Sequence, residues 1–295
     1  MLFDLIALKG VDVVSGVKRI YLAISENGKA IIQNANNAWT KIDAGVTNYL
    51  TKCFAFGNGF YLACGGLGKI HKSLDGLIWT VAATIGSGTG TVLLYNGTLF
   101  VVSFGNSYFY TSTDGVTWTG RVSWNTVSSN GGCYGGGKFV IVGNNQIGVS
   151  SDGITWTRYT SVTGAIHAVA YGDDLYVIVL SSGQIWTSPD AIIWTQRTSN
   201  FTPGFSSTNL YGIAYGNGMW VAGGDGGRRY SSTDGINWTL RSAPTSQAVL
   251  SIVYTDGYFW AAGNAGTMTR SADGITWELV DVGAGTLNIT GAFVC

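Results

Sequence analysis

The sequence predicts an all-β fold, a seven-bladed β-propeller of four-stranded antiparallel blades. Three observations lead to this prediction: a turn motif that recurs at even spacing, short Gly and Asn turns between alternating segments, and a glycine-rich composition with only 11% charged residues. A repeat of about 40 residues with four short strands is typical of one propeller blade rather than of an independent domain.

The recurring motif reads S-x-D-G-x-x-W. Five full copies run from Ser73 to Trp79, Ser112 to Trp118, Ser150 to Trp156, Ser232 to Trp238 and Ser271 to Trp277, and a sixth, Ser188 to Trp194, has Ala191 in place of the Gly. A degraded copy ends at Trp39, and from there the successive tryptophans are 40, 39, 38, 38, 44 and 39 residues apart. This near-constant period predicts seven equivalent units.

Each unit repeats the same order of segments. An alternating segment such as Ile166–Tyr171 has the period of two that is typical of a strand with one buried face. A turn such as Asn217-Gly218 follows, and these residue types accept the positive φ of tight hairpins. A second strand (Met219–Gly223), a third strand and the motif come next, and the Trp-Thr pair begins a fourth strand.

The motif itself has a structural explanation. Ser and Asp side chains bond to nearby backbone N–H groups, Gly accepts a left-handed conformation, and Trp covers the hairpin. We therefore expect structural roles for Asp75, Trp79, Asp114, Trp118, Asp152, Trp156, Asp190, Trp194, Asp234, Trp238, Asp273 and Trp277. The motif resembles the Asp-box of sialidase-like (BNR) propellers, S-x-D-x-G-x-x-W, but here Gly follows Asp directly and one residue fewer precedes Trp. The resemblance implies the fold over residues 25 to 280 and leaves the function open.

We expect one domain, a propeller over residues 16–295 that is closed by a C-terminal strand at 287–295. That strand would complete the blade begun near the N-terminus and remove an open edge. Val11–Ser15 could occupy the same place, so residues 1–15 are either an N-terminal arm or a first strand.

Composition excludes several classes of function. Net charge is zero, with 16 basic and 16 acidic residues, which argues against nucleic-acid binding. No apolar run approaches ~20 residues, so we expect no membrane insertion. The N-terminal residues lack signal-peptide features, and we expect a protein made in the cytoplasm. Four cysteines without zinc spacing and two histidines, His71 and His167, predict no metal and no cofactor.

Candidate catalytic residues do not form a recognisable set. Sialidase-like chemistry requires three converging arginines, a tyrosine with a glutamate, and an acid. Instead Lys41, Arg121, Arg158, Arg197 and Arg241 each follow a motif tryptophan by two or three residues, which spreads them over the outer strands as edge charges. The histidines are interpreted as ordinary strand residues. We expect no enzyme.

A binding surface is expected where the loops vary. Turns after first and third strands share one face of a propeller, and the second turns and the links between blades share the other. Variable loops on a rigid scaffold commonly carry binding, so we assign contacts to Trp124, Asn125, Asn200, Phe201, Phe205, Arg228 and Arg229. The alternative is that these aromatics pack the links and that the two arginines are an exposed surface pair.

The leading hypothesis is a non-catalytic binding or structural propeller, incorporated in a bacteriophage virion as a tail or capsid-associated component for host recognition or assembly. The resemblance to short DGxxW propellers of phage and bacterial proteins favours it. Its expected partners are other proteins of an assembly or a cell-surface glycan or receptor, and a multimer of the chain in a particle is compatible with this hypothesis. A glycan-binding lectin is the alternative, and a sialidase-like glycoside hydrolase is less favoured. A further resemblance is to propeller assembly factors such as the photosystem II stability factor, which dock protein partners.

Overall fold

The computed structural model describes residues 21–25, 29–33, 39–43, 53–76, 78–104, 108–122, 129–197, 209–285 and 288–294. In this part of the chain the regular structure consists of β-strands and three single-turn 3₁₀ segments, η2 (Ser181–Gly183), η4 (Asp225–Gly227) and η5 (Asn264–Gly266). No helix in these ranges has the length and hydropathy needed to cross a bilayer.

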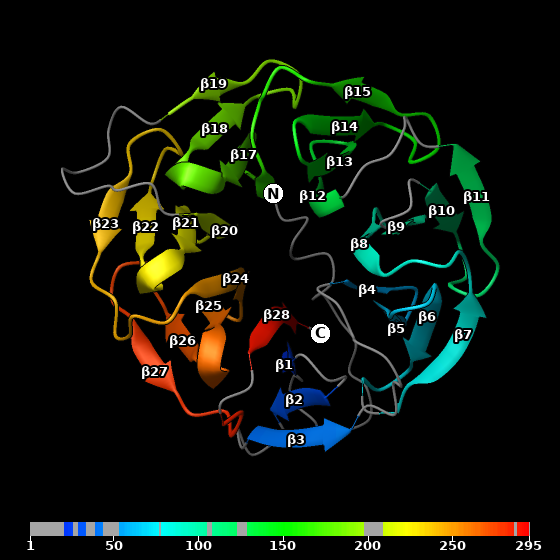
Figure 1. Cartoon of the computed structure of the whole chain (residues 1–295), viewed down its shortest axis with the longest axis horizontal. Coiled ribbons are helices and arrows are strands. Elements are labelled where there is room, and N and C mark those ends of the chain that lie inside the picture. Colours follow the sequence, from blue (N-terminus) through cyan, green and yellow to red (C-terminus); the bar gives the residue numbers. More distant parts are fainter. Residues whose placement is uncertain are drawn as a thin grey trace.

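The strands form antiparallel four-stranded sheets that stand around a common centre, as in a β-propeller (Figure 1). In chain order the sheets are β4 (Phe54–Gly57), β5 (Phe60–Cys64), β6 (Lys69–Ser73), β7 (Thr80–Thr84); β8 (Gly90–Tyr95), β9 (Phe100–Phe104), β10 (Tyr108–Ser112), β11 (Thr119–Val122); β12 (Ser129–Gly135), β13 (Lys138–Gly143), β14 (Gln146–Ser150), β15 (Thr157–Tyr159); β16 (Ile166–Gly172), β17 (Leu175–Leu180), β18 (Ile185–Ser188), β19 (Thr195–Gln196); β20 (Leu210–Gly216), β21 (Met219–Gly224), β22 (Arg229–Ser232), β23 (Thr239–Arg241); β24 (Val249–Thr255), β25 (Tyr258–Gly263), β26 (Met268–Ser271), β27 (Glu278–Val280).

A further sheet joins the two ends of the chain in the order β28-β1-β2-β3, from β28 (Ile289–Val294), β1 (Tyr21–Ser25), β2 (Lys29–Gln33) and β3 (Trp39–Asp43). Its β28 takes the place nearest the centre, where the other sheets have their first strand (Figure 1). Residues 1–15, the alternative for this place, lie outside the described residues.

The first strands line the centre, and neighbouring ones contact each other from β4 through β8, β12, β16, β20 and β24 to β28. The fourth strands, from β3 to β27, lie at the circumference (Figure 1). The hairpin turns after β4, β12, β16, β20 and β24 place both central residues at positive φ, for example Asn217 (48°) and Gly218 (72°). Positive φ was expected there from the sequence, and at both positions it is typical of a type I′ turn.

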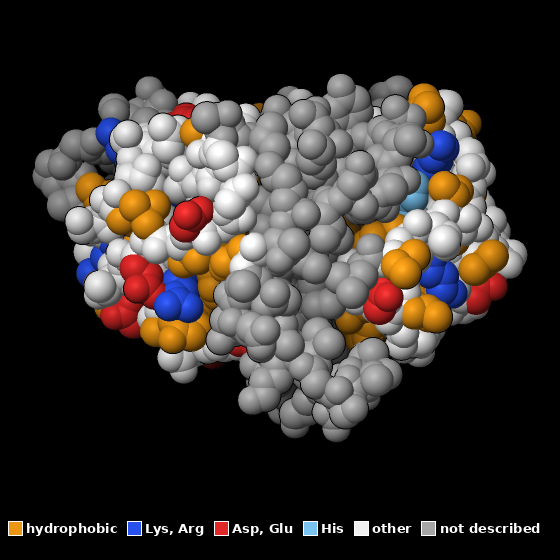
Figure 2. Space-filling model, turned by 90° about the horizontal axis from the view of Figure 1, so that it is seen from below, with side chains coloured by type: hydrophobic (Ala, Val, Ile, Leu, Met, Phe, Trp, Pro, Cys, Tyr) orange, Lys and Arg blue, Asp and Glu red, His pale blue; other side chains and the backbone are white. Residues whose placement is uncertain are grey.

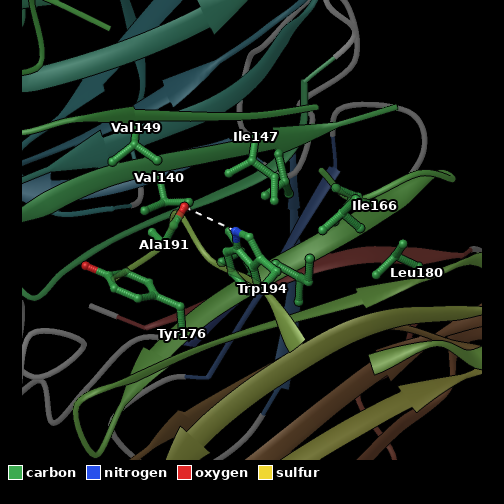
Figure 3. Packing of buried hydrophobic residues seen from close by; sticks show 12 residues of the cluster. Val140, Ile147, Val149, Ile166, Tyr176, Leu180, Ala191 and Trp194 are labelled. Carbon is green, nitrogen blue, oxygen red and sulfur yellow. Dashed lines mark hydrogen bonds between the residues drawn. The ribbon is translucent and has the colours of Figure 1, made fainter. Parts of the chain in front are cut away.

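The core lies between sheets rather than within them. Val140, Ile147 and Val149 of one sheet pack against Ile166, Leu180 and Trp194 of the next (Figure 3). Every second strand from β5 to β25 is buried along nearly its whole length. Each sheet has a neighbour on both sides, so side chains of both orientations on these second strands leave water.

Tyrosines near the ends of the first strands wedge neighbouring sheets together. A Cβ placed on Gly216 would lie 2.0 Å from Cγ of Tyr254, and one on Gly172 would lie 2.1 Å from Cδ1 of Tyr215. Each tyrosine also packs on an aromatic residue of its own second strand, as Tyr254 does on Phe259 at 4.7 Å between centroids. One ring face meets a glycine and the other meets an aromatic ring, so these tyrosines are packing residues.

Candidate functional site

The S-x-D-G-x-x-W turns are closed by their own hydrogen bonds. Ser150 Oγ donates to Asp152 Oδ1 at 2.9 Å and accepts the N–H of Gly153 at 2.8 Å. Asp152 Oδ1 also accepts the N–H groups of Thr155 and Ile154, and these bonds hold the pKa of the carboxyl at about 2. The Ser–Asp bond recurs at 2.8–3.0 Å in the other five turns. These aspartates stabilise turns, as the sequence predicts.

The arginines that follow the motif tryptophans do not converge. Nε of Arg121, Arg197 and Arg241 donates to Thr111, Thr187 and Ser231 of the adjacent third strand, at 2.7–2.9 Å. Arg158 is exposed on β15, and Lys41 belongs to β3. No cluster of three His, Cys, Asp or Glu that could hold a metal occurs in the described ranges.

Of the seven binding residues assigned from sequence, five (Trp124, Asn125, Asn200, Phe201 and Phe205) lie outside the described residues. Arg228 is half-buried beside η4, where its carbonyl accepts the N–H of Gly224. The interpretation of Arg228 and Arg229 as an exposed pair is wrong for Arg229, which is 1% exposed. The alternation of a strand turns adjacent side chains to opposite faces, and that of Arg229 enters the seam with the next sheet.

A different set of residues marks the end of the ring that carries the second turns and the links, which we call the linker face. The register shifts by one residue at the start of β8, β12, β16, β20, β24 and β28. Each shift is a β-bulge at an equivalent place on an innermost strand. The extra residues with described side chains are Thr91, Asn130, His167, Tyr211 and Leu250, and all five are half-buried. We call them the bulge ring.

The first members of the bulge ring are linked to the following sheet. Thr91 Oγ1 hydrogen-bonds Ser129 Oγ of β12, which lies 2.6 Å from Ser103 Oγ. Asn130 Nδ2 donates to the carbonyl of Ile166 on β16 at 2.9 Å. These bonds fix the orientation of both bulge residues at the seams they cross.

His167 and Tyr211 bring ionisable groups together. Nε2 of His167 lies 3.0 Å from Ser181 Oγ on η2. The His167 ring meets the Tyr211 ring edge-on at 5.0 Å between centroids. The hydroxyl of Tyr211 accepts a hydrogen bond from Asn209 Nδ2 at 3.1 Å, and burial raises the pKa of Tyr211. At neutral pH this hydroxyl therefore keeps its proton.

Asn209 ties two second turns to this part of the ring. Its Oδ1 accepts the N–H of Ser182 in η2, and its N–H donates to Asp225 Oδ2 in η4 at 3.0 Å. Asn288 binds the N–H of Ala265 in η5 in the same way, at 2.9 Å. At these two places an asparagine that directly precedes an innermost strand thus fixes a second turn next to the bulge ring.

Sequence reasoning missed the bulge ring. His167 and Tyr211 are 44 residues apart and belong to strands with no shared pattern at that position. A sequence signal does exist, since both occupy the second residue of a first strand, but the bulge depends on pairing with a second strand. On the side of the molecule seen in Figure 2, basic, acidic and apolar side chains are interspersed over the described part.

The fold and the rim define a β-propeller with a polar site at one end of its centre, and comparisons with known proteins agree on the fold. The family model described as the DUF6242 beta propeller domain matches residues 158–245 and 189–294. No curated protein matches the sequence.

Among solved structures, YCF48 from Cyanidioschyzon merolae is similar with a TM-score of 0.63 and 18% identity, covering 83% of this chain and 94% of that one. YCF48 bound to D1 peptide gives 0.51 and 17%, covering 65% and 67%. A catalytically inactive virginiamycin B lyase from Staphylococcus aureus with quinupristin gives 0.69 and 12%, covering 90% and 89%. At these identities the likeness extends to the fold alone.

Proposed function

We propose that the chain is a non-catalytic binding propeller of seven blades, closed by β28, and that its bulge ring holds an extended segment of a partner protein. The observation that carries the proposal is that the backbone at the bulges is the same from sheet to sheet, whereas the side chains there differ. The bulge recurs at one place in six innermost strands, while the side chains presented there are Thr, Asn, His, Tyr and Leu. Bulges at the rims of β-structures commonly re-aim side chains next to functional sites.

The chemistry of the bulge ring favours a peptide. Its hydroxyl, amide and imidazole groups can donate and accept hydrogen bonds and so suit the N–H and C=O groups of an extended backbone, while Leu250 offers an apolar contact. The YCF48 structure with a D1 peptide shows that a propeller of similar fold takes a peptide. Because the described residues of the bulge ring include no Asp, Glu, Lys or Arg, we expect binding that depends little on salt.

Two further observations support a binding role without catalysis. The carboxylates of the motif turns are engaged by their own backbone, and the arginines of the outer strands are held apart by separate hydroxyl partners. The closed turn geometry also supports the Asp-box relationship, and the sheets from β28-β1-β2-β3 to β24–β27 support the count of seven blades. Incorporation in a phage virion stays a prediction.

The test is a peptide selection on the purified chain, with a random peptide library displayed on yeast. Affinities of the selected peptides are then measured by fluorescence polarisation at 50 and 300 mM salt. Variants His167→Ala, Tyr211→Ala and Asn130→Ala probe the bulge ring. Ile154→Ser and Ile275→Ser, exposed residues of the motif turns on the opposite face, are matched controls.

We expect each bulge-ring variant to weaken binding at least tenfold and the controls to change it less than twofold. Selection of no peptide, or equal losses in both sets, would refute the peptide site. A glycan array run alongside addresses the lectin alternative. Sugar binding that is lost in the bulge-ring variants would replace the peptide by a glycan as the ligand.

A further inference from the structure

One position in the repeat is apolar in five of the sheets with described side chains and charged in the sixth. This third-strand residue pairs with the last residue of the second strand in the case of Ile70 and with the penultimate residue in the other five, and it is buried in all six: Ile70, Phe109, Ile147, Ile185, Arg229 and Met268. This residue packs at the motif tryptophan of the next sheet. Phe109 stacks on Trp156 at 4.9 Å, and Ile147 shares a cluster with Trp194 (Figure 3). Arg229 takes this place against Trp277, with Cζ 4.8 Å from the ring centroid.

The charge of Arg229 is not neutralised by the surrounding protein. Nη1 donates to the carbonyl of Gly227 at 2.6 Å, and Nη2 donates to Thr269 Oγ1 of the next sheet at 2.7 Å. Neither acceptor is charged, and no carboxylate pairs with this guanidinium within the described ranges. Burial lowers its pKa to about 10, so the side chain is still protonated at neutral pH. A buried cation without a counter-charge is costly to fold.

Two N–H donors at this seam also have no acceptor. Nε of Arg229 and Nε1 of Trp277 are both buried without a hydrogen-bond partner. In four other motif turns the tryptophan Nε1 donates to a carbonyl of its own turn, at 2.9–3.2 Å, whereas Nε1 of Trp118, which packs against the cluster of Ile70, also lacks a partner. The orphaned Nε of Arg229 is therefore the donor that distinguishes this seam. Buried donors are nearly always satisfied, so orphaned ones indicate a missing acceptor. At this seam the acceptor required is one that also brings negative charge.

We propose that the seam between β22 and β26 binds a small monovalent anion of the halide class at Arg229. A halide accepts N–H bonds and neutralises the guanidinium, and it has no proton of its own that would need a partner. A monatomic anion is the smallest ligand that meets both requirements. The ion stabilises the folded ring by binding only when β22 and β26 are assembled, and it makes this seam the one that responds to chloride.

Thermal unfolding in sodium chloride and in sodium gluconate at equal ionic strength tests the site. Above the dissociation constant, each tenfold rise in chloride is expected to raise the Tm by roughly 2–3 °C. The variant Arg229→Met places at this position the residue type that the next sheet has there, Met268, and it is expected to lose this chloride response. Arg241→Met is the matched control, because Arg241 pairs with Arg229 across β22 and β23 and bonds only Ser231.

Crystals of the unaltered chain soaked in sodium bromide provide a second readout that does not depend on a variant folding. An anomalous bromine peak between the Arg229 guanidinium and Trp277 is the expected result. The proposal is overturned if the unaltered chain responds equally to chloride and gluconate, if Arg229→Met keeps the chloride response, or if no peak occurs at Arg229.

Discussion

Replacing Gly216 by alanine tests whether the tyrosine wedges hold the sheets together. The added Cβ would lie 2.0 Å from Cγ and 2.1 Å from Cδ1 of Tyr254, whereas ordinary contacts are 3.4–4 Å. The ring must therefore move by more than an ångström, and Phe259 lies behind it at 4.7 Å between centroids. Overpacking of this kind costs about 3 kcal/mol, the upper end of its usual range. For a chain of this length the Tm falls by roughly 5–10 °C.

Gly120→Ala is the control, because a Cβ there makes only an ordinary 3.6 Å contact with Tyr110. Chemical denaturation by urea, followed by tryptophan fluorescence, gives the free energy of unfolding of both variants. The double variant Gly216→Ala/Tyr254→Ala is expected to be more stable than the sum of its single changes by about 1–3 kcal/mol, since the clash needs both groups. If Gly216→Ala matches Gly120→Ala to within about 0.5 kcal/mol, the wedge explanation is wrong.

Three further predictions concern stability. In chloride-free buffer, Arg229→Met is expected to be as stable as the unaltered chain or more stable by up to about 4 kcal/mol, because an apolar residue removes the cost of burying an unpaired charge. A large loss in the free energy of unfolding, measured by urea denaturation, would contradict this expectation. Burial, with Lys69 nearby, lowers the pKa of His71 to about 4 from an ordinary 6.5. Between these two pH values the unfolded chain therefore binds one proton more than the folded chain, and the free energy of unfolding falls by roughly 1 kcal/mol for each pH unit below 6.5. The variant His71→Leu is expected to flatten the curve of Tm against pH from pH 6.5 to 4. An unchanged slope in this variant would show that another group is responsible. Ser150→Ala strands the buried N–H of Gly153 and is expected to cost about 1–3 kcal/mol, measurable by calorimetry against the exposed Ser151→Ala, which should be neutral.

The period of the motif predicted the propeller because each copy of the motif forms the same turn at the same place in a blade. A Trp every 38–44 residues requires one equivalent hairpin per unit, and Ser, Asp and Gly in fixed order require one turn conformation. The positive-φ turns could be read in the same way, since Asn217-Gly218 and Asp256-Gly257 are residue types chosen for that backbone. Features that depend on a few neighbouring residues, such as these turns, can therefore be predicted from one sequence.

The candidate site could not be predicted because it is made by contacts between units. Arg229 follows another arginine, and arginine is a residue type usually found at the surface. Only its register in β22 shows that its side chain enters the seam between two sheets. His167 and Tyr211 meet because equivalent positions of successive sheets adjoin, and each is displaced by a bulge that no residue type encodes. The side chain at such a repeated position indicates a site only when the equivalent positions of all sheets are compared in three dimensions.

The sheet built from both ends of the chain has a consequence for synthesis on the ribosome. β28 pairs with β1, although every other described strand lies between these two in the sequence. Until β28 is synthesised, β1 therefore lacks its neighbour, and the nascent chain exposes an unpaired edge that can accept strands from other molecules. Closure has to wait for β28, which makes it a long-range and slow step. A circular permutant opened at the Asn96-Gly97 turn would bring β28 and β1 into one continuous hairpin region, and it should shorten the time during which this edge stays open.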